Sequence, residues 1–94
     1  MKQFYFVEIT DTFSGDANYS WVRRYLVRAA SELGAVNVIS RNYRAGWRRV
    51  YSHSDNGGRY DLRGAAVCMF VDWIEANEVD DYLARYLRTE KVNF

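Results

Sequence analysis

Hydrophobic and polar positions alternate along the first third of the chain. In residues 3–10 every second side chain is apolar, and β-branched and aromatic residues dominate, so we expect a first strand there. Residues 11–18 hold Ser, Gly, Asp and Asn and predict a loop. Alternation returns in residues 19–29. We interpret this stretch as a second strand because Tyr, Trp and Val are dense in it, with a helix as the alternative.

The pattern then changes to a helical period. Ser31 is a candidate N-cap, and Gly34 near the helix start weakens it by about 1 kcal/mol relative to Ala. Apolar residues follow at three- and four-residue spacings, at Leu33, Val36, Ile39 and Tyr43. We expect the helix to end at Ala45-Gly46 and to depend on packing against a sheet.

Three further strand-like runs follow this helix. Residues 47–52 and 59–63 are joined by a segment with an Asn56-Gly57 pair, which is a strong hairpin signal. Residues 65–74 are almost continuously apolar, as in a strand that is covered on both faces. A buried helix is the alternative for this run.

The last predicted element is a helix that begins at Ala76 or Asn77. Acidic residues occupy its first turn and basic residues its last, so both ends complement the helix dipole. These residues are Glu78, Asp80 and Asp81, then Arg85, Arg88 and Lys91. Its apolar stripe comprises Val79, Leu83, Tyr86 and Leu87.

This order of elements predicts an α+β fold. We expect an antiparallel sheet of four or five strands with two helices on one face, in the order ββαββ(β)α. The chain of 94 residues is too short to divide between two cores, so residues 1–94 form a single domain. Hydrophobic residues at 49% and aromatic residues at 17% exclude a disordered chain.

Composition also restricts the setting and the chemistry. Cys68 is the single cysteine, and no secretory pattern opens the chain, so we expect the reducing cytoplasm of a host cell. No stretch approaches the length of a membrane span, so no membrane partner is expected. One His and one Cys are too few for a structural zinc site, and we expect no metal and no cofactor.

No group of residues predicts an enzyme. The run Ser52-His53-Ser54-Asp55 has the residue types of a hydrolase triad, but consecutive side chains of a hairpin point alternately outward and do not converge. Cys68 lies in the most apolar run, where a thiol is inert packing. We therefore expect no catalytic residues.

Charge is segregated along the chain, although 13 basic and 12 acidic residues leave a net charge of only +1. Residues 21–49 contain seven arginines against the single acid Glu32. Residues 72–81 contain acids and no basic residue. Two explanations compete: the blocks neutralise each other as exposed ion pairs worth under about 1 kcal/mol each, or they form contact surfaces.

The predicted partner-binding residues follow from this segregation. Arginine and aromatic residues interleave in the basic block, a composition shared by protein-binding hot spots and by surfaces that stack bases and pair phosphates. The basic candidates are Arg23, Arg24, Arg41, Arg44, Trp47, Arg48 and Arg49. The acidic candidates, which would imitate nucleic-acid phosphates, are Asp72, Glu75, Glu78, Asp80 and Asp81.

Two segments carry a resemblance. DTFSGDANYSWVRRY at residues 11–25 and RYDLRGAAVCMFV at residues 59–71 resemble a type of small protein found in phage and prophage genomes. The type has no settled activity, so the resemblance implies a setting: small phage proteins of this size include host-takeover and anti-defence factors, anti-CRISPR proteins among them. The acidic stretch at residues 72–81 lies outside the matching motifs.

The leading hypothesis is therefore a non-enzymatic phage or mobile-element protein that inhibits a host defence complex, as anti-CRISPR proteins do, by occupying its surface. The expected partner is a host protein or ribonucleoprotein complex. The alternative is a nucleic-acid-binding module that uses an Arg/Tyr/Trp sheet face. Both a monomer and a homodimer fit the sequence, since aromatic residues on a small sheet leave apolar surface to cover.

Overall fold

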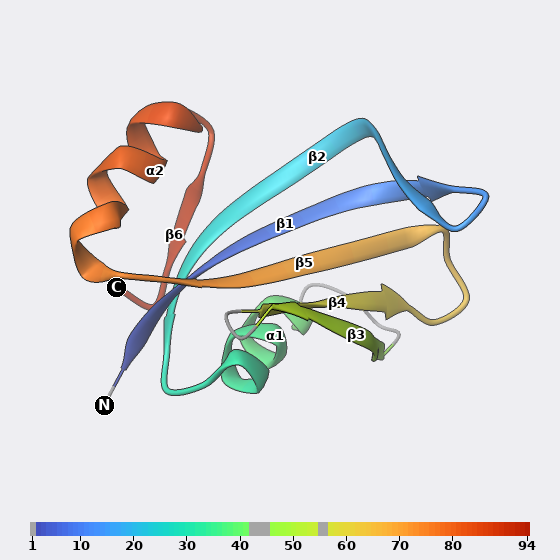
Figure 1. Ribbon diagram of the computed structural model, residues 1–94, viewed down its shortest axis with the longest axis horizontal. Helices are drawn as coiled ribbons and strands as arrows, with labels where there is room; N and C mark the ends of the chain where they lie inside the picture. Colours follow the sequence, from blue (N-terminus) through green and yellow to red (C-terminus); the bar gives the residue numbers. More distant parts are fainter. Residues whose placement is uncertain (1, 42–45, 55–56) are drawn as a thin grey trace.

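The chain folds as an α+β domain built on one six-stranded sheet (Figure 1). The computed structural model describes residues 2–41, 46–54 and 57–94, except for the side chains of residues 51–54. The strand order across the sheet is β3-β4-β5-β1-β2-β6. Neighbouring strands are antiparallel except β2 and β6, which are parallel. The sheet is thus mixed rather than antiparallel, and it has six strands instead of the predicted four or five.

The elements follow one another along the chain as β1 (Gln3–Phe13), β2 (Asp16–Ala29), α1 (Glu32–Ser40), β3 (Trp47–Ser54), β4 (Gly57–Leu62), β5 (Val67–Ile74), the 3-10 helix η1 (Ala76–Glu78), α2 (Val79–Arg85) and β6 (Glu90–Val92). The run at residues 65–74 is a strand, so the helix alternative for it is wrong. The stretch at residues 19–29 is also a strand, as predicted. Ser54 pairs with Gly57, which confirms the β3–β4 hairpin.

The predicted loop at residues 11–18 is wrong, because β1 and β2 continue into it and leave only Ser14 and Gly15 between them. Both residues have positive φ, 53° and 86°, as a tight hairpin turn requires. The polar residues around them belong to the strands. The Asp11 carboxylate accepts hydrogen bonds from the Asn18 side chain at 2.8 Å and from the Ser20 backbone N–H at 2.9 Å.

An irregularity in the β1–β2 pairing turns Tyr19 to a different face from the one its spacing predicts. The register shifts between Thr10 and Thr12, and Tyr19 has a φ of 55°. Thr10, which is fully buried, fills the irregularity: its hydroxyl accepts from the Tyr19 N–H at 3.0 Å and donates to the Trp21 carbonyl at 2.8 Å. The Tyr19 hydroxyl consequently reaches Glu8 rather than the face of Tyr25.

Helix α1 covers one face of the sheet. Ser31 caps it, accepting from the Gly34 N–H at 3.0 Å, as predicted. Its buried residues are Ala35, Val36 and Ile39, and they pack in one core with the sheet residues Tyr5, Val7, Ile9, Tyr25, Val27, Ala29, Tyr60, Met69 and Val71. Leu33, predicted to face the core, is exposed. The helix ends at Ser40, before Ala45-Gly46, and Tyr43 lies outside the described residues.

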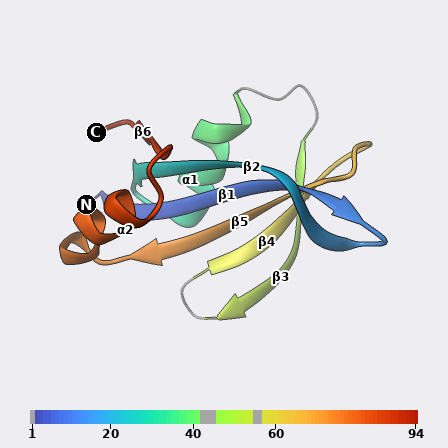
Figure 2. The ribbon, with the colours of Figure 1, turned by 90° about the horizontal axis from the view of Figure 1, so that it is seen from above.

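Helix α2 packs on the opposite face, which corrects the expectation that both helices share one face (Figure 2). Phe6, Leu26 and Ile74 form a second core with partly buried α2 residues. Side chains of consecutive residues on one strand point to opposite faces of the sheet. Val7 therefore packs in the core under α1, and Phe6 packs in the second core under α2. The ring of Phe6 lies 4.9 Å from that of Tyr82 and 4.9 Å from that of Tyr86, centroid to centroid.

The C-terminal helix is also shorter than predicted, since α2 ends at Arg85. Arg88 and Lys91 lie beyond it, in the connection and in β6, and Leu87 is 86% exposed rather than part of an apolar stripe. The chain turns back because β6 pairs with Tyr25, Leu26 and Val27 of β2. Among the described residues, no helix is long and apolar enough to cross a membrane.

Candidate functional site

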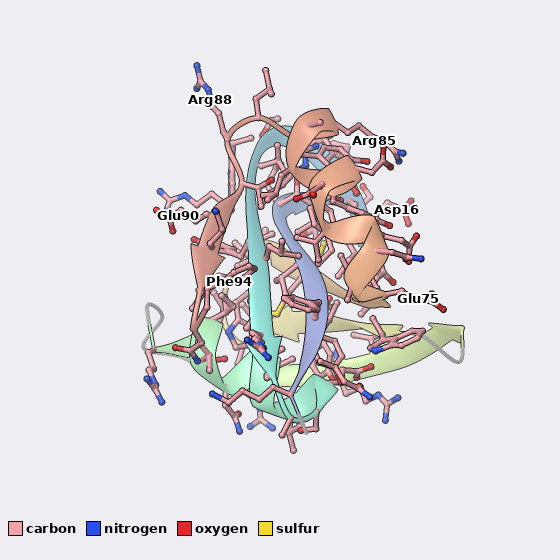
Figure 3. The ribbon with its side chains drawn as sticks, turned by 90° about the vertical axis from the view of Figure 1, so that its left-hand side faces the viewer. Asp16, Glu75, Arg85, Arg88, Glu90 and Phe94 are labelled. Carbon is pink, nitrogen blue, oxygen red and sulfur yellow. The ribbon has the colours of Figure 1, made fainter. Side chains whose placement is uncertain are left out.

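A hollow of about 630 Å³ opens between β2 and the segment that connects α2 to β6. Residues 22–25 of β2 line one side, and residues 85–88 with Glu90 line the other. The two segments separate because β6 begins its pairing only at Tyr25. Four of the lining residues are arginines and one, Glu90, is acidic, so the lining carries an excess of positive charge. Figure 3 shows Arg85, Arg88 and Glu90 around the end of α2.

Arg24 is held in place inside the hollow. Its Nε lies 2.8 Å from Oε2 of Glu8 on the neighbouring strand β1, and its guanidinium lies 4.6 Å from the centre of the Tyr86 ring. The Tyr19 hydroxyl donates to the other oxygen of Glu8 at 3.1 Å. Burial, followed by the charge of Glu8, raises the pKa of Tyr19 to about 12. Arg24 therefore joins β2, β1 and α2, and its charge is matched by Glu8.

Arg85 is also paired. Its Nη2 donates to Oδ2 of Asp81, one helical turn earlier, at 2.6 Å. Its guanidinium lies 5.7 Å from the centre of the Tyr82 ring. Both charges are more than half exposed, so the pair contributes about 0.3–0.5 kcal/mol to stability. It neutralises one of the basic residues at the rim of the hollow.

Arg23 and Arg88 remain unpaired. Both are exposed, and across residues 2–41, 46–54 and 57–94 no carboxylate lies within ion-pair distance of either. Leu87, between Arg88 and the end of the helix, is 86% exposed. The hollow thus combines two unmatched cations with a large apolar side chain in solvent. That combination fits a partner surface that is both acidic and apolar.

The predicted acidic residues lie on the consecutive elements β5, η1 and α2. Asp72 lies on β5, half-buried, and its Cα is paired with that of Gly57. Glu75 and Glu78 form a capping box at η1, in which the Glu75 N–H donates to Glu78 at 2.9 Å. Asp80 is exposed, and Asp81 pairs with Arg85. Three of the five acids therefore have structural roles in the cap or the helix.

The other predicted basic residues that the structure describes lie at the end of α1 and on β3. Arg41 is the C-cap of α1, and Arg48 and Arg49 are neighbours on β3, so their side chains leave opposite faces. Arg49 lies 4.0 Å from Glu32, and Trp47 packs against the α1 core. Arg44 lies outside the described residues. Of the basic candidates that the structure describes, Arg23 and Arg24 are the two that line the hollow.

The described aromatic side chains in and near the basic block do not form one exposed face, and the side chains of Tyr43 and Tyr51 lie outside the described residues. Tyr25 and Tyr60 are buried in the α1 core. Tyr19 and Trp21 are partly exposed near the β1–β2 turn. A row of exposed rings, which base stacking requires, is therefore not formed by these residues.

Of the groups considered for catalysis, Cys68 is the one whose side chain the structure describes. Cys68 is fully buried, and burial raises the pKa of its thiol. The His53 side chain falls outside the described part of the structure. No cluster of three or more His, Cys, Asp or Glu suited to a metal ion occurs among the described residues.

Sequence reasoning missed the roles of Glu8 and Leu87 and the placement of Arg23 and Arg88 around one hollow. The sequence pattern places Arg88 in the last turn of a helix, where the helix dipole alone accounts for a positive charge. A signal was present in the sequence: Leu87 and Arg88 lie next to Glu90-Lys91-Val92, a short run with an apolar position that can pair with a sheet edge. No family model, no curated protein and no solved structure matches this chain.

Proposed function

We propose that this chain is a non-enzymatic binding protein that inhibits a host defence complex, in the manner of anti-CRISPR proteins, by covering part of its surface. The observation that supports the proposal is the unmatched pair Arg23 and Arg88 beside the exposed Leu87. A partner that presents acidic groups around an apolar contact would match both charge and apolarity. The phage-type setting comes from the resemblance of residues 11–25 and 59–71.

A protein surface fits the hollow better than a nucleic acid does. Phosphates would pair with Arg23 and Arg88, but Leu87 would gain nothing from a phosphate backbone. Base stacking would need the aromatic residues of the basic block on one face, and Tyr25 and Tyr60 are in the core. The expected partner is therefore a protein subunit of the defence complex, reached in the host cytoplasm.

The test is a phage-plating assay in bacterial strains that each carry one type of active CRISPR immunity against the infecting phage. Expression of the wild-type chain should restore plaque formation by at least a hundredfold in one strain. The charge-reversal variant R23E/R88E should lose this effect. The matched control K2E/R63E, with the same change in net charge at exposed residues outside the hollow, should keep it.

Two results would contradict the proposal. In the first, the wild-type chain restores plaques in no strain. In the second, both double variants behave alike although circular dichroism shows that both are folded. Titration with single- and double-stranded oligonucleotides at two salt concentrations tests the nucleic-acid alternative, since phosphate-driven binding must weaken steeply with salt.

A further inference from the structure

The outer edge of β2 is covered over only part of its length. β6 pairs with Tyr25, Leu26 and Val27, whereas residues 16–24 have β1 on one side and no strand of the described chain on the other (Figure 1). Backbone N–H and C=O groups on such an edge are a template for another strand. Because Tyr19 has a φ of 55°, the regular part of the open edge comprises residues 20–24.

This open edge leads directly into the basic hollow. Residues 22–24 belong to both, and Arg88 stands on the opposite side of the hollow. Five residues of a paired strand span about 16 Å. A strand laid along residues 20–24 would therefore place one end beside Arg23 and Arg88.

The side chains along residues 20–24 indicate which kind of strand can pair with the open edge of β2. Trp21 and Arg23 point to one face and Val22 and Arg24 to the other. A second copy of this chain, paired edge to edge along residues 20–24, would bring a second Arg23 and a second Arg24 to the same edge, and like charges close together across a strand pair are destabilising. An extended segment with acidic residues opposite Arg23 and apolar residues opposite Val22 has no such conflict.

We propose that an extended acidic segment of the partner protein adds as a strand to the open edge of β2 at residues 20–24, with an acidic side chain opposite Arg23 and one end of the strand at the hollow that Arg88 also lines. This inference rests on the proposed function and specifies how the partner is recognised. Main-chain hydrogen bonds supply the pairing, and the alternation of acidic and apolar side chains supplies the selectivity.

The experiment uses a synthetic probe, the peptide Ac-Gly-Glu-Val-Glu-Val-Glu-Val-Gly-NH2, titrated into the isotope-labelled full chain. Amide signals of residues 20–24 should shift, and their hydrogen exchange should slow at least tenfold at saturation. Replacing the three Glu by Lys should abolish binding. R23E/R88E should weaken binding at least tenfold, and K2E/R63E should leave it within twofold.

Two N-methylated forms of the same peptide separate strand pairing from charge attraction. One carries methyl groups on the amides of the three Glu and the other on the amides of the three Val, so only one form blocks the hydrogen bonds toward β2. One form should bind at least tenfold more weakly than the other. Equal affinities, or signal shifts confined to residues outside 20–24, would overturn the strand inference.

Failure of this inference differs from failure of the proposed function. If plaque restoration depends on Arg23 and Arg88 while the two methylated peptides bind alike, the partner uses the hollow without adding a strand. If no strain responds to the wild-type chain, the proposed function fails whatever the peptides do.

Discussion

Arg59 of β4 donates a hydrogen bond through Nη2 to the carbonyl oxygen of Gly15, at 2.7 Å and 44 residues earlier in the chain. Its Nε also donates to Asp61 at 3.0 Å. In the sheet, β5 lies between β4 and β1, so the two partners are not on neighbouring strands. The contact therefore fixes the tip of the β1–β2 hairpin over the sheet face that carries Arg59.

Replacing Arg59 by Met should release this tip. We expect the free energy of unfolding to fall by about 1.5–3 kcal/mol, the range for hydrogen bonds that involve a charged group. Urea unfolding measures the change, and hydrogen exchange should speed up at Ser14 and Gly15. Arg63→Met, at an exposed arginine, should stay within about 0.5 kcal/mol of wild type. Equal effects of the two substitutions would contradict the role of Arg59.

Gly57→Ala should destabilise the junction of β4 and β5. A Cβ at Gly57 would overlap the carbonyl oxygen of Val71 and lie 2.6 Å from Oδ1 of Asp72. Overpacking of this kind costs about 1–3 kcal/mol. Gly46→Ala is the control, because a Cβ there meets nothing within 4 Å. Thermal unfolding should show a lower Tm for Gly57→Ala alone, and an unchanged Tm would show that the strands yield without cost.

The carboxyl group of Asp11 should make the free energy of unfolding depend on pH in the acidic range. Hydrogen bonds from Ser20 and Asn18 hold the pKa of its carboxyl below the ordinary value. The unfolded chain therefore binds this proton more readily than the folded chain does. The resulting stability is fully present above pH of about 4 and decreases as the pH falls further.

Asp11→Asn should remove this dependence. Urea unfolding at pH 7, 5 and 3 should show a stability difference between wild type and variant that is the same at pH 7 and 5 and smaller at pH 3. Asp16→Asn, an exposed carboxylate for which no hydrogen bond is seen in the described structure, is the control. A difference that grows toward pH 3 would have the wrong sign and refute the assignment.

The hydroxyl group of Tyr60 should make the free energy of unfolding depend on pH in the alkaline range. Its hydroxyl donates to Glu32, and burial, then this hydrogen bond, raise the pKa of Tyr60 to about 12. The pKa of Tyr60 in the folded chain exceeds its value of about 10 in the unfolded chain. The contribution of the protonated Tyr60 hydroxyl to the free energy of unfolding is therefore complete below pH 10 and is lost between pH 10 and 12.

Tyr60→Phe should cost about 1 kcal/mol at pH 7 and progressively less above pH 10. Absorbance at alkaline pH should show one tyrosine fewer among those that ionise late. Tyr19, whose pKa is also about 12, must still be seen in the variant. If the number of late tyrosines is unchanged, Tyr60 is not one of them.

Local signals in the sequence identified most elements. Alternation predicted β1 and the core of β2, Ser31 predicted the start of α1, and the Asn56-Gly57 pair predicted the β3–β4 hairpin. These features depend on residues that are close in the chain. The predicted loop at 11–18 failed because the hydrogen bonds of Asp11 with Asn18 and Ser20 join the two strands, so the polar residues stabilise pairing instead of ending it.

The candidate site was predictable only in part. Arg23 and Arg24 stood out in the basic block, but their meeting with Arg88 requires α2 to cross Phe6 and Leu26 and the chain to return as β6. A three-residue parallel strand has almost no signal of its own, because its pairing partner lies some 65 residues away. Likewise, nothing local distinguishes a helix that packs on one face of the sheet from a helix that packs on the other.

The sequence by itself determined most of the elements, the α+β fold class and the surplus of arginine near β2, because these follow from short-range periodicity, capping and composition. Tertiary structure decided which charges remain unmatched. Glu8 neutralises Arg24 across a strand pair and Asp81 neutralises Arg85 along a helix, while Arg23 and Arg88 line the same hollow as Glu90 with no carboxylate of the described chain within ion-pair distance. Coulomb interactions depend on distance in space, and only the folded chain sets those distances.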